Sequence, residues 1–563
     1  MTQMNGGAAV VETLRAAEVT HVFGLLGSST MEVYDALYDA DDIKYVGVRH
    51  EAFGVHMSDG FARAKGSPGV FLAGQAGPGS VNMVAGLAAA KLAYSPVVCI
   101  TGLVATDHFG RDAFQEVDQQ NLFASLVKKN ITVIRPDRVP AAIEEALRVA
   151  NSGRRGPVVV NIPRDMFAAQ IEADIKAPDY DVGAAAGTYN PEAVAKACEI
   201  LRNAKAPAIL AGAGVKWGRG ADEVCRLSNQ LQIPVTASAG HPDVVPTNHP
   251  FFAGQIGPRG NEVASVATRE ADVILAIGTR LAFNTTFYTY NDINKDAKIV
   301  QIDIEPMALG KYFPIDVGII GDAGTVAGAI ADAMSDMSAD SVPWKARSEQ
   351  FIQDLKALWD SREEDGKSTL TPLRPERVFA ELRQAAPEDT LFTLDAGTMC
   401  LQATDKLRYN GAPSMLTPLD YGLVGFGFPC GLGAKCGQPD RTVVSLHGDG
   451  GFGMVLPEFA TAIQSEINTI TVVFDNGCWG AEKSYQRDFY QGRYIGCDTV
   501  NPRYDEFAKL YGAGGFYCEE PGSLADAMSE AVKADSPVII HVKVDPEAMV
   551  SFRRDAFTHR AQQ

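Results

Sequence analysis

The sequence has no excess of basic residues and no long apolar run. Its 563 residues include 50 Lys and Arg against 69 Asp and Glu, which gives a formal net charge of −19. Nucleic-acid-binding proteins normally carry a basic face, so we expect no nucleic-acid partner. The N-terminus lacks the basic and then apolar pattern of a signal peptide, and no run of about 18 apolar residues predicts a membrane span. An anionic substrate would need a local basic pocket in so acidic a protein.

The nine cysteines are scattered along the chain, without a CxxC pair or a His/Cys cluster at metal-binding spacing. This pattern argues against a zinc site and against a disulfide scaffold. We interpret the cysteines as reduced and mostly buried thiols of a cytoplasmic protein.

Short β-branched runs alternate with longer helical patterns along the whole chain. Near-continuous apolar strands with helices between them predict the α/β class, with parallel sheets flanked by helices. The expected strands include residues 97–102, 157–163, 272–278, 298–304, 442–448 and 469–474. Two segments, 174–192 and 334–376, resemble linkers. They predict three domains, 1–175, 190–335 and 372–563, of which the first and third could repeat one fold.

A strand in the third block ends in Gly448-Asp449-Gly450, and the next strand ends before Asn476. A spacing of strand, helix and strand places both side chains at the carboxyl ends of neighbouring parallel strands, where α/β proteins bind ligands. A carboxylate, an amide oxygen and phosphate oxygens suit Mg²⁺, and the glycines allow the backbone to approach phosphates. The alternative is an ordinary glycine turn.

A second polar pair lies in the first block, where His50-Glu51 follows a strand and begins an Ala- and Gly-rich helix. A Glu at a helix start is most often only a favourable partner of the helix dipole.

Together these segments resemble thiamine diphosphate enzymes of the acetolactate synthase/pyruvate decarboxylase superfamily. The third block is similar to the GDG…NN signature of that superfamily, with Asp475 in place of the first Asn. The resemblance implies three Mg²⁺ ligands, namely Asp449, Asn476 and the carbonyl of Cys478. It also implies that Gly448 and Gly450 approach the diphosphate of the cofactor.

The resemblance extends to the pyrimidine end of the cofactor. Residues around Glu51 are similar to the HE…ADGYAR segment, in which the Glu hydrogen-bonds the aminopyrimidine ring and makes its exocyclic amine a base. Segment 74–82 resembles the GPG segment of the family. The 420–429 segment resembles the loop in which the Gly422 carbonyl and Val424 contact the cofactor, although larger residues are common at position 424. Segment 394–399 corresponds to the diphosphate loop, which implies roles for Gly397 and Thr398.

Four short segments, 23–29, 112–119, 479–483 and 551–556, resemble sulfoacetaldehyde acetyltransferases. These enzymes expel sulfite from sulfoacetaldehyde and pass the acetyl group to phosphate. Arg and Lys side chains suit such oxyanions. The implied substrate contacts are Ser28, Phe114, Gln115, Lys483, Arg553 and Arg554. Gln115 and His50 are the implied polar contacts to the reacting group. For the two arginines the alternative is a solvated tail.

Three other readings stay open. Segment 112–119 also resembles acetolactate synthases, which makes a carboligase the first alternative. The second is an acyl-CoA enzyme such as a 2-hydroxyacyl-CoA lyase or an oxalyl-CoA decarboxylase. A catalytically dead, nucleotide-binding relative is opposed by the intact Glu51, Asp449 and Asn476. Segments 209–215 and 277–282 of the middle block resemble positions where some members bind FAD and others ADP, although a purely structural domain fits as well.

The superfamily implies a homodimer or homotetramer, in which one subunit supplies the Glu and its partner supplies the metal site.

Overall fold

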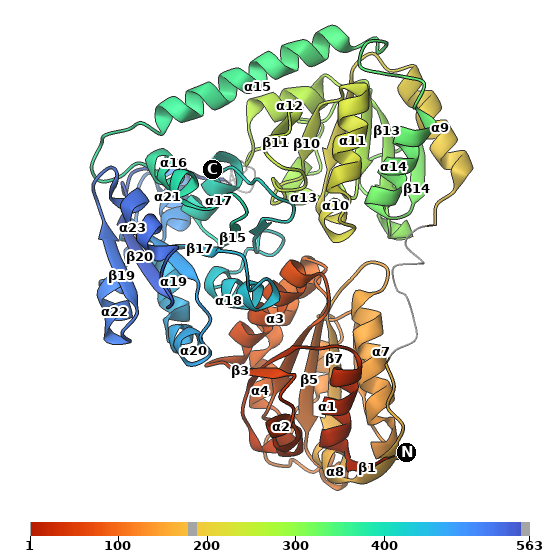
Figure 1. Ribbon diagram of the computed structural model, residues 1–563, viewed down its shortest axis with the longest axis vertical. Coiled ribbons are helices and arrows are strands. Elements are labelled where there is room, and N and C mark those ends of the chain that lie inside the picture. Colours follow the sequence, from red (N-terminus) through yellow and green to blue (C-terminus); the bar gives the residue numbers. More distant parts are fainter. Residues whose placement is uncertain (1, 178–187, 553–563) are drawn as a thin grey trace.

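The computed structural model describes residues 2–177 and 188–552. In these residues three six-stranded sheets, all of them parallel, are each flanked by helices (Figure 1). This confirms the predicted fold class. The strands predicted from the apolar runs are all present, within one residue at most of their boundaries.

The N-terminal sheet has the strand order β3-β2-β4-β5-β7-β6. Its strands are β2 (His21–Leu25), β3 (Lys44–Gly47), β4 (Gly69–Ala73), β5 (Val97–Leu103), β6 (Lys129–Thr132) and β7 (Val158–Pro163). Its helices include α1 (Gly6–Ala16), α2 (Met31–Tyr38), α3 (Glu51–Lys65), α4 (Pro78–Asn82), α5 (Val84–Leu92) and α7 (Val139–Asn151). Strands β1 (Thr2–Asn5) and β8 (Gln170–Ala173) form a separate antiparallel pair.

The C-terminal sheet has the order β16-β15-β17-β18-β20-β19. Its strands are β15 (Leu391–Leu394), β16 (Met415–Leu416), β17 (Val443–Gly448), β18 (Ile470–Asp475), β19 (Gly514–Cys518) and β20 (Val538–Lys543). Its helices include α16 (Pro375–Ala385), α17 (Thr398–Lys406), α18 (Gly427–Gly437), α19 (Asp449–Val455), α20 (Phe459–Gln464), α21 (Gly480–Phe489), α22 (Tyr504–Leu510) and α23 (Ser523–Ala531). Counted within each domain, the N- and C-terminal sheets share one strand order, so the two domains repeat the same topology.

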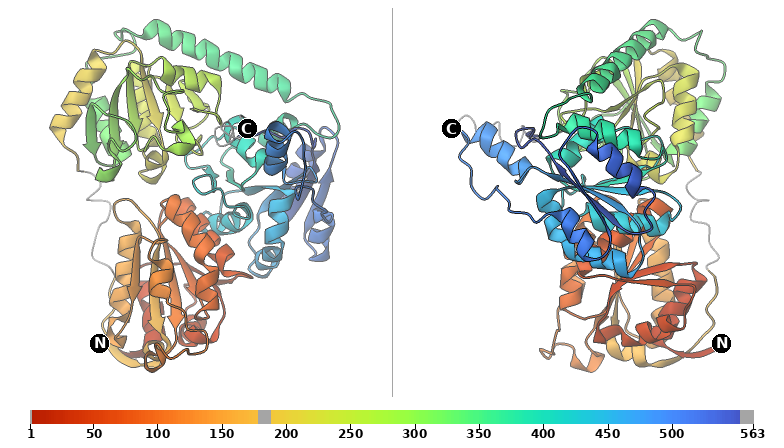
Figure 2. Two further views of the ribbon diagram at one scale, coloured as in Figure 1. Left: turned by 180° about the vertical axis from the view of Figure 1, so that it is seen from behind. Right: turned by 60° about the vertical axis from the view of Figure 1, so that its left-hand side comes forward.

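The middle sheet has a different order, β11-β10-β9-β12-β13-β14, which is the order of dinucleotide-binding folds. Its strands are β9 (Pro207–Ala211), β10 (Val235–Ala237), β11 (Phe252–Gln255), β12 (Val273–Ile277), β13 (Lys298–Asp303) and β14 (Val317–Ile320). Its helices include α9 (Pro191–Arg202), α10 (Ala213–Trp217), α11 (Ala221–Leu231), α12 (Glu262–Arg269), α13 (Phe283–Thr286) and α14 (Ala323–Ala333). The segment predicted as a second linker contains the long helix α15 (Lys345–Asp365), which extends along the outer edge from the middle to the C-terminal domain (Figures 1 and 2).

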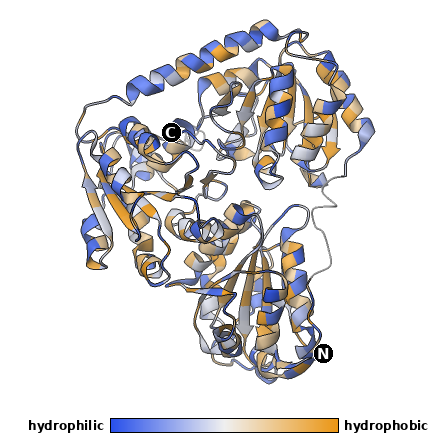
Figure 3. Ribbon diagram, in the orientation of Figure 1, coloured by the Kyte–Doolittle hydropathy of each residue, from blue (hydrophilic) through white to orange (hydrophobic). Residues whose placement is uncertain are grey.

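Burial explains why the apolar runs form parallel strands. Every residue of β4, β9 and β12 is buried, as expected when helices cover both faces of a sheet. In Figure 3 the sheet interiors are mostly apolar, whereas α15 is largely hydrophilic. Seven of the nine cysteines are buried, which confirms that part of the prediction. None of the helices in the described part of the chain is long and apolar enough to cross a membrane.

Helices α3 and α18 hold the N- and C-terminal domains together at a close crossing. A Cβ added at Gly60 of α3 would lie 2.0 Å from the carbonyl oxygen of Cys430, and one at Gly433 of α18 would lie 1.7 Å from that of Met57. Only glycine permits the two backbones to approach so closely. This contact places the beginning of α3 beside the C-terminal domain.

Candidate cofactor site and central pocket

The two predicted metal-ligand side chains follow neighbouring strand ends. Strands β17 and β18 are parallel, with Gly448 paired to Phe474. Asp449 begins α19 directly after β17, and Asn476 begins the loop after β18. The Asp449 carboxylate accepts hydrogen bonds from the Thr499 hydroxyl at 2.8 Å and the Asn501 amide at 2.5 Å. Burial raises the pKa of the Asp449 carboxyl, so a cation would favour its charged form.

The oxygen chemistry of this loop fits a hard cation. The carboxylate of Asp449, the amide oxygen of Asn476 and the backbone carbonyl of Cys478 are oxygen ligands, which Mg²⁺ prefers. The described residues contain no group of three or more His, Cys, Asp or Glu side chains that could hold a metal ion.

Asp475, which departs from the family signature, has its charge balanced inside the domain. Its carboxylate accepts from Lys543 Nζ at 2.9 Å and lies 3.1 Å from His541 Nε2. Burial would raise the pKa of Asp475, but His541 and Lys543 lower it to about 2. The Gly477 N–H also donates to this carboxylate at 2.9 Å. Sequence reasoning missed both partners, because they lie on β20, more than sixty residues away.

Four glycines lie at or after the carboxyl ends of strands β15 to β18 of the C-terminal sheet. A Cβ added at Gly397, Gly422, Gly448 or Gly477 would meet nothing within 4 Å. Three of the four have positive φ, namely 128° at Gly397, 82° at Gly422 and 69° at Gly477, which favours glycine. Thr398 directly follows Gly397 and begins α17. The open backbone surface fits a ligand that needs close approach, such as a diphosphate, and we call these four residues the glycine cradle.

Asp395 holds the loop that follows Gly422, and the sequence did not predict this role. Its buried carboxylate accepts from the N–H groups of Gly425, Phe426 and Gly427 at 3.1, 2.7 and 3.3 Å. Burial would raise its pKa, but His447 and the N–H groups of Gly425 and Phe426 lower it below its usual range. Asp395 thus ties the loop of Gly422 and Val424 to strand β15. Half-buried Val424 packs beside α19, where a Cβ at Gly451 would lie 3.1 Å from its Cγ1.

Glu51 begins α3, as predicted, and only 6% of its surface is exposed. The Asn82 amide donates to its Oε2 at 2.9 Å. His50 is the N-cap of the helix, since the Ala52 N–H donates to its Nδ1 at 3.2 Å, and its side chain is exposed. Glu51 therefore lies in the dry setting that its proposed chemistry needs.

Ser28 and Gln115 meet at the carboxyl edge of the N-terminal sheet through Gln75. The Ser28 N–H donates to Gln75 Oε1 at 2.9 Å, and the Gln75 amide donates to Gln115 Oε1. Gln115 has a φ of 67°, a strained value for a non-glycine residue that is common at functional sites. Gly77 contacts the Gln115 carbonyl closely: a Cβ added at Gly77 would lie 2.3 Å from the Gln115 carbonyl oxygen. The neighbouring Phe114 is 86% exposed.

The other predicted substrate contacts lie near α21. Lys483 Nζ donates to Asp498 at 2.8 Å, so its charge has a partner within the chain. Ser551 lies beside the same helix: its hydroxyl donates to Asp488 at 2.5 Å, and both Ser551 and Phe552 are buried. Arg553 and Arg554 lie outside the described residues.

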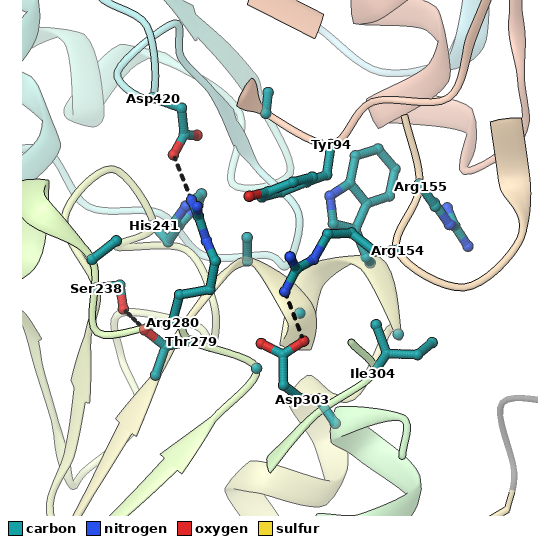
Figure 4. A pocket seen from close by; sticks show the side chains of 18 of the residues that line it. Tyr94, Arg154, Arg155, Ser238, His241, Thr279, Arg280, Asp303, Ile304 and Asp420 are labelled. Atoms are coloured by element: carbon teal, nitrogen blue, oxygen red, sulfur yellow. Dashed lines mark hydrogen bonds and ion pairs between the residues drawn. The ribbon is translucent and has the colours of Figure 1, made fainter. Parts of the chain in front are cut away.

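A cavity of about 640 Å³ opens where the three domains meet (Figure 4). It lies at the switch point between β9 and β12, the place where such sheets bind ligands. The glycine-rich turns after both strands line it, as do three arginines, Arg154, Arg155 and Arg280. Arg154 and Arg280 lie 4.9 and 4.7 Å from the ring centroid of Tyr94, which stands between them. Arg154 also lies 3.3 Å from Asp303.

Comparisons with known proteins agree with this arrangement. Three family models match: the N-terminal TPP binding domain of thiamine pyrophosphate enzymes over residues 4–122, their central domain over 194–330 and their C-terminal TPP binding domain over 395–542. Thiamine pyrophosphate is another name for thiamine diphosphate. The chain is 34% identical to a sulfoacetaldehyde acetyltransferase of Alcaligenes xylosoxydans xylosoxydans, over 99% of this chain and 96% of the relative.

Acetolactate synthases are similar to nearly the same degree. The chain is 32% identical to a probable acetolactate synthase large subunit of Methanococcus aeolicus, over 97% of this chain and 93% of the relative. It is 30% identical to the acetolactate synthase isozyme 2 large subunit of Escherichia coli (strain K12), over 96% of both chains. With three family models matched in order and full-length relatives above 30% identity, the chain belongs to the thiamine pyrophosphate enzymes.

Proposed function

We propose that this enzyme converts sulfoacetaldehyde and phosphate to acetyl phosphate and sulfite. The observation that carries the proposal is how the four segments similar to sulfoacetaldehyde acetyltransferases pair in space. Segments 23–29 and 112–119 meet through Ser28, Gln75 and Gln115. Segment 479–483 begins α21, and Ser551 donates to Asp488 further along the same helix. Two relatives with that name at 34% identity also support it.

We propose that Asp449, Asn476 and the Cys478 carbonyl hold Mg²⁺, with Gly397, Thr398, Gly448 and Gly450 along the diphosphate. The Gly422 carbonyl and Val424 would contact the pyrimidine, and Glu51 would share a proton with it. When bound, thiamine diphosphate supplies a nucleophilic carbon that adds to the donor carbonyl. A homodimer or homotetramer in which Glu51 serves the cradle of the partner, as the family resemblance implies, is part of the proposal.

We propose that both the N-terminal and the C-terminal domain supply substrate contacts. In the N-terminal domain, the donor substrate would contact His50, Gln115, Ser28 and Phe114. Gln115 has the strained backbone conformation described above. Lys483, Arg553 and Arg554 would bind the sulfonate and phosphate oxyanions, for which Arg forks are suited. Phe552 and Ser551, which directly precede the two arginines in the sequence, are buried.

A phosphate titration of wild type and an R553A/R554A double variant tests the proposal. Loss of a charge-assisted hydrogen bond costs about 1.5–3 kcal/mol, so acetyl phosphate formation should fall about 10- to 150-fold. Sulfite release should continue, with water replacing phosphate as acceptor. A wild-type rate independent of phosphate would exclude the acetyltransferase function but not the thiamine diphosphate chemistry. A double variant identical to wild type in both products would assign the arginines to a solvated tail.

The second candidate is an acetolactate synthase-like carboligase, favoured by relatives of 29–32% identity and by segment 112–119. It predicts acetolactate from pyruvate, with no need for phosphate or sulfoacetaldehyde. An acyl-CoA lyase would instead require a CoA thioester. A screen of 2-oxoacids, sulfoacetaldehyde and hydroxyacyl-CoAs separates the three.

For the central pocket we propose a nucleotide ligand, FAD or ADP. Its support is the strand order of the middle domain, the turns at Gly214 and Gly278, and the arginines that could pair with phosphates. The alternative is a structural domain without ligand. The cytoplasmic location stays a prediction.

A further inference from the structure

Glu458 is a buried carboxylate to which the proposed chemistry gives no role. It ends the short 3₁₀ turn Leu456–Glu458 that follows α19, and its exposed fraction is 0%. An ionised carboxylate in such a place needs hydrogen-bond donors, because burial of an unpaired charge is strongly unfavourable. The identity of its donors therefore indicates what it does.

Two of the donors come from the N-terminal domain. The backbone N–H groups of Arg49 and His50 donate to Glu458 Oε1 at 2.9 and 3.0 Å. These are the two residues immediately before Glu51. The Thr461 hydroxyl donates to the other oxygen at 2.7 Å. Burial raises the pKa of Glu458, and these three hydrogen bonds oppose that shift.

Other contacts fasten the same junction of β3 and α3 to the region around α20. The Thr461 hydroxyl also lies 3.2 Å from the Gly47 carbonyl oxygen, and Arg49 donates to the Gln464 side chain at 2.8 Å. The Thr461 contact is partly buried and the Arg49 contact is exposed. Glu458 and Thr461 are both fully buried, and Glu458 is the one that binds the backbone next to Glu51.

We infer that Glu458 is a positioning residue for Glu51: it anchors the backbone of Arg49 and His50 and so fixes where α3 begins and where the Glu51 carboxyl lies. This inference rests on the proposed role of Glu51. It adds that the position of Glu51 depends on Glu458, a residue of the C-terminal domain of the same chain. Displacement of a reacting group by about 1 Å can cost about 10²-fold in rate. None of these hydrogen bonds involves a residue of the glycine cradle or a proposed metal ligand.

The chain offers a matched control in Glu381. This buried carboxylate on α16 also accepts backbone N–H groups, those of Gly522, Leu524 and Ala525, but within the C-terminal domain, where it also pairs with Arg377. Glu381→Ala should therefore lower the thermal midpoint of unfolding much as Glu458→Ala does. It should not alter the position of Glu51.

The experiment measures three quantities in Glu458→Ala, Glu458→Gln and Glu381→Ala. They are proton exchange at the thiazolium carbon of bound cofactor by NMR, calorimetric affinity for thiamine diphosphate with Mg²⁺, and amide hydrogen exchange of residues 47–53 without cofactor. In Glu458→Ala the thiazolium exchange should slow about 10- to 100-fold, the affinity should stay near wild type, and the amides of Arg49 and His50 should exchange faster. Glu458→Gln keeps an acceptor oxygen, so its thiazolium exchange and its amide exchange should both lie close to the wild-type rates.

Glu51→Gln serves as the reference. Wild-type thiazolium exchange in Glu458→Ala, with slow exchange in Glu51→Gln, would overturn the positioning role and leave the role of Glu51 intact. Wild-type exchange in Glu51→Gln would overturn the role of Glu51 itself. Equal slowing in Glu381→Ala would reduce the effect to general destabilisation and also overturn the inference. Should Glu458→Ala not fold, Glu458→Asp, which withdraws the carboxylate by one methylene, should show the same slowing.

Discussion

Replacing Gly448 with Ala should weaken cofactor binding without weakening the fold. Its backbone has φ −76° and ψ 156°, which any residue adopts, and an added Cβ meets nothing within 4 Å. Surface changes without a clash usually alter stability by less than about 0.5 kcal/mol. Ala also restricts the unfolded chain more than Gly, which can stabilise by about 0.4–1 kcal/mol. The cofactor-free protein should therefore unfold at or slightly above the wild-type temperature.

The Gly448→Ala substitution should be unfavourable only for cofactor binding. Under the proposed function the open space at Gly448 receives the diphosphate, and a methyl group there keeps the backbone from approaching it. Loss of one charge-assisted hydrogen bond costs about 1.5–3 kcal/mol, which weakens affinity about 10- to 150-fold. Calorimetry with thiamine diphosphate and Mg²⁺ measures this directly.

Gly451, three residues further on, is the matched control. A Cβ there would lie 2.2 Å from Asp395 Oδ2 and 3.1 Å from Val424 Cγ1, so the surroundings must move. Overpacking of this kind costs about 1–3 kcal/mol, and Gly451→Ala should lower the thermal midpoint even without cofactor. Wild-type cofactor affinity in Gly448→Ala, or wild-type stability in Gly451→Ala, would refute the geometry of the cradle.

Three further predictions test other parts of the site. Glu51→Gln should slow thiazolium proton exchange about 10²–10⁴-fold with little change in cofactor affinity; NMR exchange at the wild-type rate would remove Glu51 from the mechanism. Asp449→Ala should abolish Mg²⁺-dependent cofactor retention, because it removes a proposed ligand and leaves Thr499 and Asn501 without their acceptor; unchanged calorimetric affinity would place the metal elsewhere. Arg280→Ala should weaken ADP or FAD binding about 10-fold or more, and equal titration curves would exclude this arginine from the pocket's ligand contacts.

Much of the site could be predicted from the sequence because its residues follow apolar strands. A buried parallel strand is recognisable as a continuous apolar run, and its carboxyl end marks where ligands bind. For this reason Asp449 and Asn476 lie at the strand ends, and Glu51 at the start of α3, where the apolar pattern predicts them. Their roles toward the cofactor stay predictions. The substrate roles of Arg553 and Arg554 do too.

The fold class and the strand ends follow from the sequence alone, since both depend on the local apolar pattern. Family resemblance implies roles for Gly397, Gly422 and Gly448, but Gly477 joins the cradle only from the structure. Which buried charges meet depends on how the domains pack. Lys543 neutralises Asp475 from another strand, and Glu458 reaches the backbone of His50 across a domain boundary. The central pocket, likewise, takes side chains from all three domains. No local pattern encodes such pairs, because the partner of a buried charge is set by how whole domains pack.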